Sequence, residues 1–478
     1  PPNIATWSRN IDSLRNYLEK RPAYIREHIG DLFPVTDSAK IELSRIGQGS
    51  ISASGVVLSD TLISIEFFKN AQLQLKAIPA PGYEFIGWQG VSDSANISFE
   101  VLNDTSFIAV FSAKSISIIP ANIDKDTILS AALSPWHALG EVEVQKGFQL
   151  IVEPGVEILM SDKASIYVKG GLILKGTDSQ KITLTPNPND WARQPIFNKT
   201  PKWGAIVAEN ADTIHIEHSK LSGSGYGKNR SKQFSTISAF DSPIYISHTN
   251  ISDNLQPFYS EGGQIYIGYS SFRSENTCDL INVKYSANPI VEFCDLQGNK
   301  AYDTDAIDFD GVDGGIIRQN KIYGLLGDNS DGIDLGEDAK NVLIENNIIS
   351  NCTDKGISIG QASTAIIHRN LIFDCAMGIA LKDEGSFAEI DQNTLYANGL
   401  SISAYEKNTS KGGAIAKIKN SILSQSLQAT LEVDDKSSID VSYSLSDREL
   451  LKGIGNIEGN PLFEQPSTAN FQLQVNSP

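Results

Sequence analysis

Hydrophobic and polar residues alternate in short runs that repeat along the second half of the chain. Triplets of Asn, any residue and an aliphatic residue recur 23 to 27 residues apart, beginning at Asn320, Asn346, Asn370, Asn393 and Asn420. A second series of triplets, in which Ile follows a small residue, recurs with nearly the same spacing. These triplets begin at Ala306, Gly332, Gly356 and Gly378. A period of roughly 20 to 50 residues marks a solenoid, and each period here holds short strands without a helix. The pattern predicts an all-β protein dominated by a parallel β-helix.

The same alternation predicts where the β-helix begins and ends. It restarts at Val142 and fades after Ser444, so we expect the β-helix over residues 142–447 and a C-terminal tail over 448–478. Residues 114–141 are interpreted as a linker and N-terminal cap, because the open end of a solenoid exposes strand edges and an apolar cross-section. Connections between parallel strands are right-handed in nearly all proteins, so a right-handed β-helix is expected.

Two segments interrupt the repeat. Residues 186–202 and 223–235 are polar or rich in Pro and Gly, and they contain several basic residues. We predict that both project from the β-helix as loops, where function often lies.

A small all-β module is predicted over residues 37–113. Apolar and polar residues alternate there in several short runs, and Pro81-Gly82 marks a turn between two of them. Tyr83, Phe85 and Trp88 are expected in its core rather than on a sugar-binding surface.

Residues 1–36 have the periodicity of helices. Pro22 interrupts the pattern and predicts two short helices instead of one. Such helices normally pack on something larger, so we interpret this segment as the remnant of an upstream domain of the same polypeptide. The opening Pro1-Pro2, without an initiator Met, agrees with a longer natural chain.

Charge and cysteine content narrow the function. The chain has 57 Asp and Glu against 39 Lys and Arg, a net charge of -18, which argues against nucleic acid or an anionic membrane as the partner. No apolar run is long enough to predict a membrane span. The four cysteines lack metal-ligand spacing, so we expect buried, reduced thiols, with Cys352 and Cys375 stacked in neighbouring coils.

Carboxylates line one outer face of the predicted coils. Ile307, Phe309, Ile333 and Leu335 alternate with their neighbours and are expected in the core. The residues between them then point outward, and Asp308 and Asp334 lie about 4.8 Å apart in adjacent strands. Stacked carboxylates repel unless one is protonated or a cation bridges them. We therefore predict a Ca²⁺ site made of Asp308, Asp310, Asp334 and Glu337.

A second column precedes these strands and holds Asp305, Asp331 and Lys355. In one interpretation these Asp residues only cap turns by accepting bonds from backbone N–H groups. In the other they bind substrate beside catalytic lysines. The predicted catalytic residues are Lys355 and Lys382, and the predicted substrate-binding residues are Asp305, Asp331, Arg318 and Arg369. A Lys beside carboxylates should have a raised pKa, which makes it a poorer base.

Three stretches resemble known families. Val152-Glu153-Pro154-Gly155-Val156 and the repeats that follow resemble secreted bacterial parallel β-helix proteins with PbH1-type repeats. Gly47-Gln48-Gly49 and Gly82-Tyr83-Glu84-Phe85 resemble the divergent InlB-type repeat of bacterial surface proteins. Arg21-Pro22-Ala23-Tyr24-Ile25-Arg26 resembles the tail of the CotH kinase-like domain, without any of its kinase-like motifs. The resemblances imply an exported bacterial protein, extracellular or on the cell surface.

The acidic face is also similar in composition to that of polysaccharide lyases with this fold, which bind a uronate through Ca²⁺ and use Lys or Arg as base. Asp354-Lys355-Gly356 and Ala380-Leu381-Lys382 resemble motifs of polygalacturonase-like hydrolases, but the adjacent Asp pair, the His and the Arg of those motifs are missing. The sequence thus favours an extracellular protein that engages polysaccharide, in a Ca²⁺-dependent, lyase-like manner. The alternative is a non-catalytic structural or adhesion module of a larger surface protein.

Overall fold

The computed structural model describes residues 4–33, 37–58, 60–80, 83–113, 117–188, 202–228 and 231–478. The chain divides into two compact units, Pro1–Ser115 and Ile116–Pro478. The predicted turn at Pro81-Gly82 and most of the predicted loop at 186–202 lie outside the described residues. No helix in the described ranges is long and apolar enough to cross a membrane.

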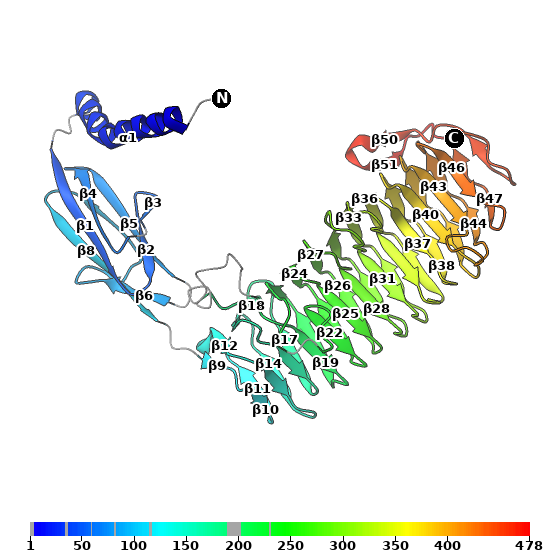
Figure 1. The fold of residues 1–478 in the computed structure, drawn as a ribbon, viewed down its shortest axis with the longest axis horizontal. Coiled ribbons are helices and arrows are strands. Elements are labelled where there is room, and N and C mark those ends of the chain that lie inside the picture. Colours follow the sequence, from blue (N-terminus) through cyan, green and yellow to red (C-terminus); the bar gives the residue numbers. More distant parts are fainter. Residues whose placement is uncertain are drawn as a thin grey trace. The chain divides into compact units, whose positions relative to one another are not determined.

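The first unit contains the predicted small β module, which consists of two four-stranded sheets (Figure 1). One sheet has the order β4 (Leu62–Phe68), β1 (Ser38–Ile46), β8 (Thr105–Ala113) and β6 (Tyr83–Trp88). The other has the order β3 (Val56–Leu58), β2 (Gly49–Ala53), β5 (Gln72–Pro79) and β7 (Asn96–Glu100). Trp88 is buried, and Phe85 packs edge-on against it at 5.8 Å between ring centroids, while Tyr83 contacts the same core. The aromatic cluster is therefore core, as predicted.

The N-terminal segment is one helix, α1 (Ile4–Leu32), and the prediction of two short helices is wrong. Pro22 removes one backbone donor from its middle without ending it. Large apolar side chains of this helix, among them Trp7 and Leu14, are exposed.

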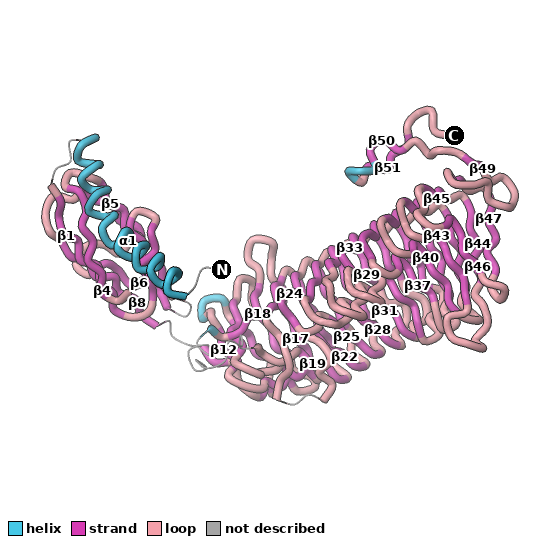
Figure 2. The backbone as a smooth tube through the Cα atoms, turned by 45° about the horizontal axis from the view of Figure 1, so that its top comes forward, coloured by secondary structure: helices cyan, strands magenta, loops and turns pink. Residues whose placement is uncertain are grey.

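The second unit is the predicted parallel β-helix, in which each coil contributes one strand to each of three sheets (Figure 2). The first sheet has thirteen strands, from β10 (Asn122–Ile123) to β46 (Ala429–Val433). The second also has thirteen, from β11 (Thr127–Leu129) to β47 (Ser438–Ser442). The third has fifteen, from β9 (Ser117–Ile118) to β49 (Ile457–Glu458).

The β-helix begins earlier than the sequence predicted. Residues 114–141 are not only a linker and cap, because β10 and β11 pair in parallel with the strands of the next coil. β12 (Trp136–Ala138) pairs in the same way with β15 (Glu157–Met160). The prolines in this first coil fall between its short strands, where a missing N–H breaks no ladder bond.

The interior of the β-helix is a continuous apolar core. The residues predicted in the core, Ile307, Phe309, Ile333 and Leu335, are fully buried. Their counterparts in the next two coils are fully buried as well: Ile357, Ile359, Ile379 and Leu381. Cys278, Cys294, Cys352 and Cys375 are buried and free, as predicted, and the thiol of Cys375 contacts that of Cys352.

Side-chain amides form a ladder through one interior corner. The Nδ2 atoms of Asn320, Asn347 and Asn370 each donate to the Oδ1 of the Asn one coil further on, at 3.0 to 3.1 Å. Each Oδ1 also accepts the backbone N–H of the preceding coil. The recurring Asn triplets are the sequence signature of this ladder, but Asn346 and Asn420 lie one residue outside it, both exposed and with φ of 55° and 50°. Ser421 takes the ladder position beside Asn420.

The C-terminal tail is more ordered than its composition suggests. β50 (Phe463–Gln465) and β51 (Asn470–Leu473) pair as a hairpin. Phe471 contacts Phe373 and Tyr396, which belong to two strands of the third sheet, at 5.3 and 5.1 Å between ring centroids. The hairpin thus covers part of that sheet.

We predict that Asn347→Ala lowers the stability of the β-helix by about 2–4 kcal/mol, because it leaves buried donors and acceptors of two coils without partners. Asn346→Gly is the matched control and should change stability by less than about 0.5 kcal/mol, since Gly accepts the same left-handed backbone. Guanidinium unfolding midpoints measure both. Equal midpoints for the two variants would show that the ladder is not needed.

Candidate functional site

The predicted acidic face lies on the outer side of the first sheet, across β28 (Ile281–Lys284), β31 (Ile307–Asp310), β34 (Ile333–Gly336), β37 (Lys355–Ile359) and β40 (Met377–Lys382). The register is the predicted one: Asp308 pairs with Asp334, and Asp334 with Ser358. We call the following residues the acid–lysine cluster: Asp279, Asn282, Lys284, Asp305, Asp308, Asp310, Asp331, Asp334, Glu337, Asp354, Lys355 and Lys382.

The first column of the cluster runs through the turns before the strands. The carboxylate of Asp279 accepts the backbone N–H of Asp305 at 3.2 Å, and that of Asp305 accepts the N–H of Asp331 at 2.6 Å. Asp331 in turn accepts the N–H of Lys355 at 2.9 Å. Each Asp therefore caps the next coil, which is the structural role that the sequence left open.

The surroundings of these carboxyl groups nonetheless disfavour their charged form. Burial, and then the charge of Asp331, raise the pKa of Asp305 well above its ordinary value. Burial raises the pKa of Asp279, and the charges of Asp303 and Asp334 add to this, although hydrogen bonds oppose it. The pKa of Asp331 is raised to about 6, mainly by burial, with the charge of Lys355 opposing the rise. A group with such a pKa exchanges protons near neutral pH.

The second column, which lies on the strands themselves, also holds a carboxyl group whose surroundings disfavour its charged form. Burial raises the pKa of Asp308 well above the ordinary value, followed by the charges of Asp279 and Asp310. Asn282 joins the two columns, because its Nδ2 donates to Asp279 at 2.9 Å and to Asp308 at 2.7 Å.

Lysines from different coils neutralise the remaining acids. Lys284 donates to Asp310 at 2.6 Å and lies 3.3 Å from Glu337. Burial lowers the pKa of Lys284, but the carboxylates of Asp310 and Glu337 outweigh it and raise that pKa overall. Tyr285 also donates to Glu337.

Lys355 and Lys382, the predicted catalytic residues, both lie in the cluster. Lys355 contacts Asp354 and lies 3.3 Å from Asp331. Burial lowers its pKa, but these carboxylates raise it overall, so the group is held as a cation and is not poised as a base.

Lys382 reaches back across two coils, and its Nζ lies 3.5 Å from Asp334. Gly360 makes this reach possible, because a Cβ at that position would lie 2.9 Å from Cε of Lys382.

The cluster has an outer and an inner layer. The side chains of Asp334, Asp354 and Lys284 are 23 to 27% exposed. Those of Asp331 and Lys355 are only 6% and 4% exposed. A ligand on this face would therefore meet the outer layer first, while the inner layer sets its charge.

The predicted Ca²⁺ ligands Asp308, Asp310, Asp334 and Glu337 do not converge as a set. In the described part of the chain, the one group of three or more His, Cys, Asp or Glu whose ligand atoms lie within 4.8 Å of one another is elsewhere, at Glu217, His218 and His248. Lys284 occupies the space between Asp310 and Glu337. Ca²⁺ at all four residues would have to displace that amino group, so the Ca²⁺ site stays a prediction.

The structure does not gather Arg318 and Arg369 with the cluster. Both belong to the second sheet, at the end of β32 (Ile316–Arg318) and directly after β38 (Thr364–His368). Arg318 pairs with Glu292 at 2.6 Å, and Arg369 donates to Gln392 at 2.7 Å.

Asp279, Asn282 and Lys284, in the coil before, also belong to the cluster and were not predicted from the sequence. A signal for two of them was present, because Ile281-Asn282-Val283-Lys284 has the same pattern as Ile307-Asp308-Phe309-Asp310. The two segments pair in register.

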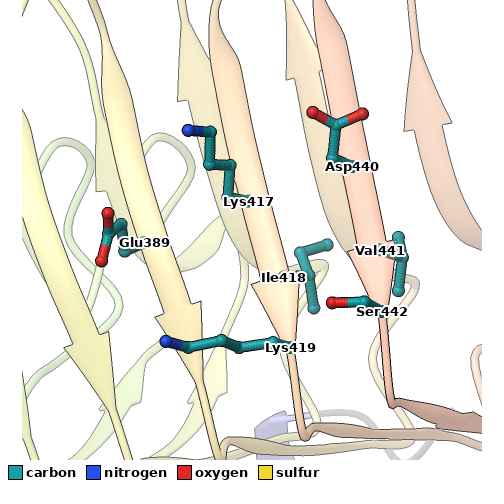
Figure 3. A pocket seen from close by; sticks show the side chains of 7 residues that line it. All are labelled: Glu389, Lys417, Ile418, Lys419, Asp440, Val441 and Ser442. Carbon is teal, nitrogen blue, oxygen red and sulfur yellow. The ribbon is translucent and has the colours of Figure 1, made fainter. Parts of the chain in front are cut away.

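Another surface hollow is a poorer candidate. It lies on the outer side of the second sheet, where Lys417 stands on a strand between those of Glu389 and Asp440 (Figure 3). Charges of alternating sign in register balance one another across neighbouring strands.

Two family models match parts of the chain. Residues 279–444 match the model described as "Right handed beta helix region", and residues 40–115 match the "Divergent InlB B-repeat domain". The second unit is thus a right-handed parallel β-helix, preceded by an InlB-like repeat, as both resemblances implied. The CotH-like resemblance of residues 7–33 stays a prediction.

One solved structure supports the same fold. A mutant of the periplasmic alginate epimerase AlgG is 14% identical, with a TM-score of 0.51 over 67% of this chain and 78% of that one. The A-module of the mannuronan C-5 epimerase AlgE4 from Azotobacter vinelandii is also 14% identical, with a TM-score of 0.39 over 72% and 91% of the two chains. No curated protein is similar enough to count as a relative.

We predict that Asp305→Asn stabilises the protein, on the order of 1 kcal/mol at neutral pH, because the amide still accepts the N–H of Asp331 without the charge. Unfolded Asp has a pKa of about 3.9. The raised folded-state pKa means that stability from this group is fully present below about pH 4 and is lost as the pH rises through the folded-state value. The gap between variant and wild type should therefore widen from pH 4 to 7 in thermal unfolding.

Asp212→Asn is a control for which the opposite change of stability is expected. Asp212 has a lowered pKa because Lys146 and the N–H of Gly147 bind its carboxylate. Its stability is present above about pH 4 and is lost as the pH falls, so the variant should be less stable than wild type at neutral pH only. A gap between Asp305→Asn and wild type that does not change with pH would contradict the raised pKa.

Proposed function

We propose that the chain is an extracellular or periplasmic β-helix protein that binds a polysaccharide across the outer layer of the acid–lysine cluster. The observation that carries this proposal is a column of buried Asp residues, in which Asp305 stands at a position where Asn would cap the next coil equally well. Perturbed carboxyl groups gather at functional sites more often than elsewhere, and the protein retains them here against their repulsion.

The amide ladder of the same β-helix supports this inference. Asn347 accepts a backbone N–H from the neighbouring coil, as Asp305 does, and it also donates to the next amide. An amide stack carries no charge, whereas stacked carboxylates repel one another. If Asp305 only capped a turn, Asn would cap it at lower cost.

The fold supports a polysaccharide as the ligand. The neighbour with a TM-score of 0.51 is named as a periplasmic alginate epimerase, and the one from Azotobacter vinelandii as a mannuronan epimerase. The long face of parallel strands offers a chain-like ligand equivalent groups in successive coils. A periplasmic or extracellular location fits such a ligand.

A lyase-type reaction is the more specific activity that we propose for this site. Asp334 would take the proton from the carbon beside the uronate carboxylate, and Lys382, only 8% exposed behind Asp334, would balance the charge of Asp334. Asp308, protonated because of its raised pKa, would donate a proton to the glycosidic oxygen as the bond to the leaving sugar breaks and a C=C bond forms. Lys355 would position the charge of Asp331 from the inner layer.

In this proposal, Ca²⁺ would offset the negative charge of the acid–lysine cluster. The cluster holds more acids than lysines, so a polyuronate would be repelled unless carboxyl groups are protonated or a cation bridges them. We therefore expect a polyuronate to bind more tightly with Ca²⁺ present than with a chelator.

We predict that Asp334→Asn/Lys382→Met weakens polysaccharide binding at least about tenfold, or about 1.4 kcal/mol, in affinity electrophoresis against polyuronates and neutral glucans. Glu389→Gln/Lys417→Met is the matched control, because it makes the same change of charge on the second sheet, and it should bind as wild type does. Ultraviolet absorbance of unsaturated products tests the lyase step in the same samples.

The outcomes separate the alternatives. Binding without an absorbance change supports the polysaccharide proposal and contradicts the lyase step. Retardation of wild type and both variants to the same extent would place binding elsewhere. A wild type that is retarded by no polysaccharide would contradict the proposal and favour the non-catalytic structural module.

A further inference from the structure

Two histidines occupy the same corner of successive coils in the β-helix. His218 lies between β20 (Thr213–Glu217) and β21 (Ser219–Ser222), and His248 lies between β23 (Ile244–Ser247) and β24 (Asn250–Asn254). Both have left-handed backbone conformations, with φ of 44° and 49°. Glu217 directly precedes the first of them. None of these residues belongs to the acid–lysine cluster.

The corner column continues with other aromatic rings. His218 stacks on His248 at 4.5 Å between ring centroids, and His248 stacks on Tyr269 at 5.0 Å. Phe293 follows at 4.6 Å from Tyr269. Because Tyr and Phe stack in this corner equally well, ring stacking alone does not require imidazoles at the first two positions.

The imidazoles and the carboxylate bring ligand atoms together. One atom from each of Glu217, His218 and His248 lies within 4.8 Å of the others. The carboxylate of Glu217 also lies 3.3 Å from His215, on the outer face of the same strand. The sequence alone does not reveal this site, because His218 and His248 are 30 positions apart in the chain.

We infer that Glu217, His218 and His248 form a binding site for a divalent transition-metal ion of the zinc class. Imidazole nitrogen and carboxylate oxygen are the ligand types that Zn²⁺ prefers among these groups, unlike the oxygen-only sets of Ca²⁺. Two atoms bound to one Zn²⁺ lie about 3.3 Å apart, given bonds of about 2.0–2.1 Å. Side-chain rotation closes the remaining distance, since His248 is exposed and the other two are only partly buried.

The site opens onto a groove that leaves room for a further ligand. His218 and His248 line a hollow of about 370 Å³ together with Asp178, Asn250 and Asp295. Three protein ligands leave at least one coordination position of Zn²⁺ for water or for an oxygen atom of a small molecule in that groove.

The test is calorimetric titration of the full, untagged chain with ZnCl₂. His218→Phe and His248→Phe each remove one ligand while keeping a ring that this corner already accepts at Phe293. Each should weaken Zn²⁺ binding by more than about 100-fold, because loss of a direct ligand exceeds the 10–100-fold effects of indirect ones. Their thermal unfolding temperatures should match wild type and so exclude a folding defect.

His368→Phe is the matched control. His368 lies on the second sheet, with its Nδ1 3.5 Å from Asp391, and its replacement should leave the Zn²⁺ affinity unchanged. Zn²⁺ affinity that is equal in wild type and His248→Phe, or that falls as much in His368→Phe, would overturn the inference. So would a wild type that binds no Zn²⁺ at millimolar concentration.

Discussion

In-register stacking of parallel strands is the constraint on which the rest of this structure depends. Each coil lies about 4.8 Å from the next, and the backbone bonds that fix this spacing also place equivalent side chains directly above one another. Whatever residue occupies a position must therefore tolerate its counterpart in the next coil. Aliphatic groups fill the interior under this rule. Amides bond to one another, and aromatic rings stack along a corner.

Side chains of like charge are unfavourable under this constraint, and the protein meets the repulsion between stacked carboxylates in three ways. Backbone N–H groups bind Asp279, Asp305 and Asp331. Lysines from other coils pair with Asp310 and Asp334. Burial and neighbouring charges favour the protonated form of Asp308. Each of these can change when a ligand arrives, which is why the cluster suits a binding or proton-transfer site better than a purely structural one.

Much of this arrangement could be predicted from sequence, because residues that are one period apart in a repeat lie in register in neighbouring coils. The pairing of Asp308 with Asp334 and the burial of the cysteines follow from spacing alone. The amide ladder follows in part. At Asn346 two successive Asn residues leave the choice open, and at Asn420 the next residue, Ser421, takes the ladder position.

The features that could not be predicted depend on where the chain turns from one sheet to the next and on how far long side chains extend. Arg318 and Arg369 lie on another sheet because the positions of the corners decide which face a residue joins. The contact of Lys382 with Asp334 spans 48 residues and depends on the missing side chain of Gly360. The first coil was missed because its strands are only two or three residues long.

The central claim is that stacked, buried carboxyl groups in the acid–lysine cluster hold protons at a pH where ordinary Asp does not. The most direct measurement is infrared titration of the folded protein, with the spectrum of Asp308→Asn subtracted from that of wild type to isolate one carboxyl group. We expect a protonated carboxyl band that persists in wild type to a clearly higher pH than the band of an ordinary Asp, and that is absent from the variant. A band that disappears near pH 4, as for an exposed Asp, would contradict the claim and leave the column as a set of turn caps.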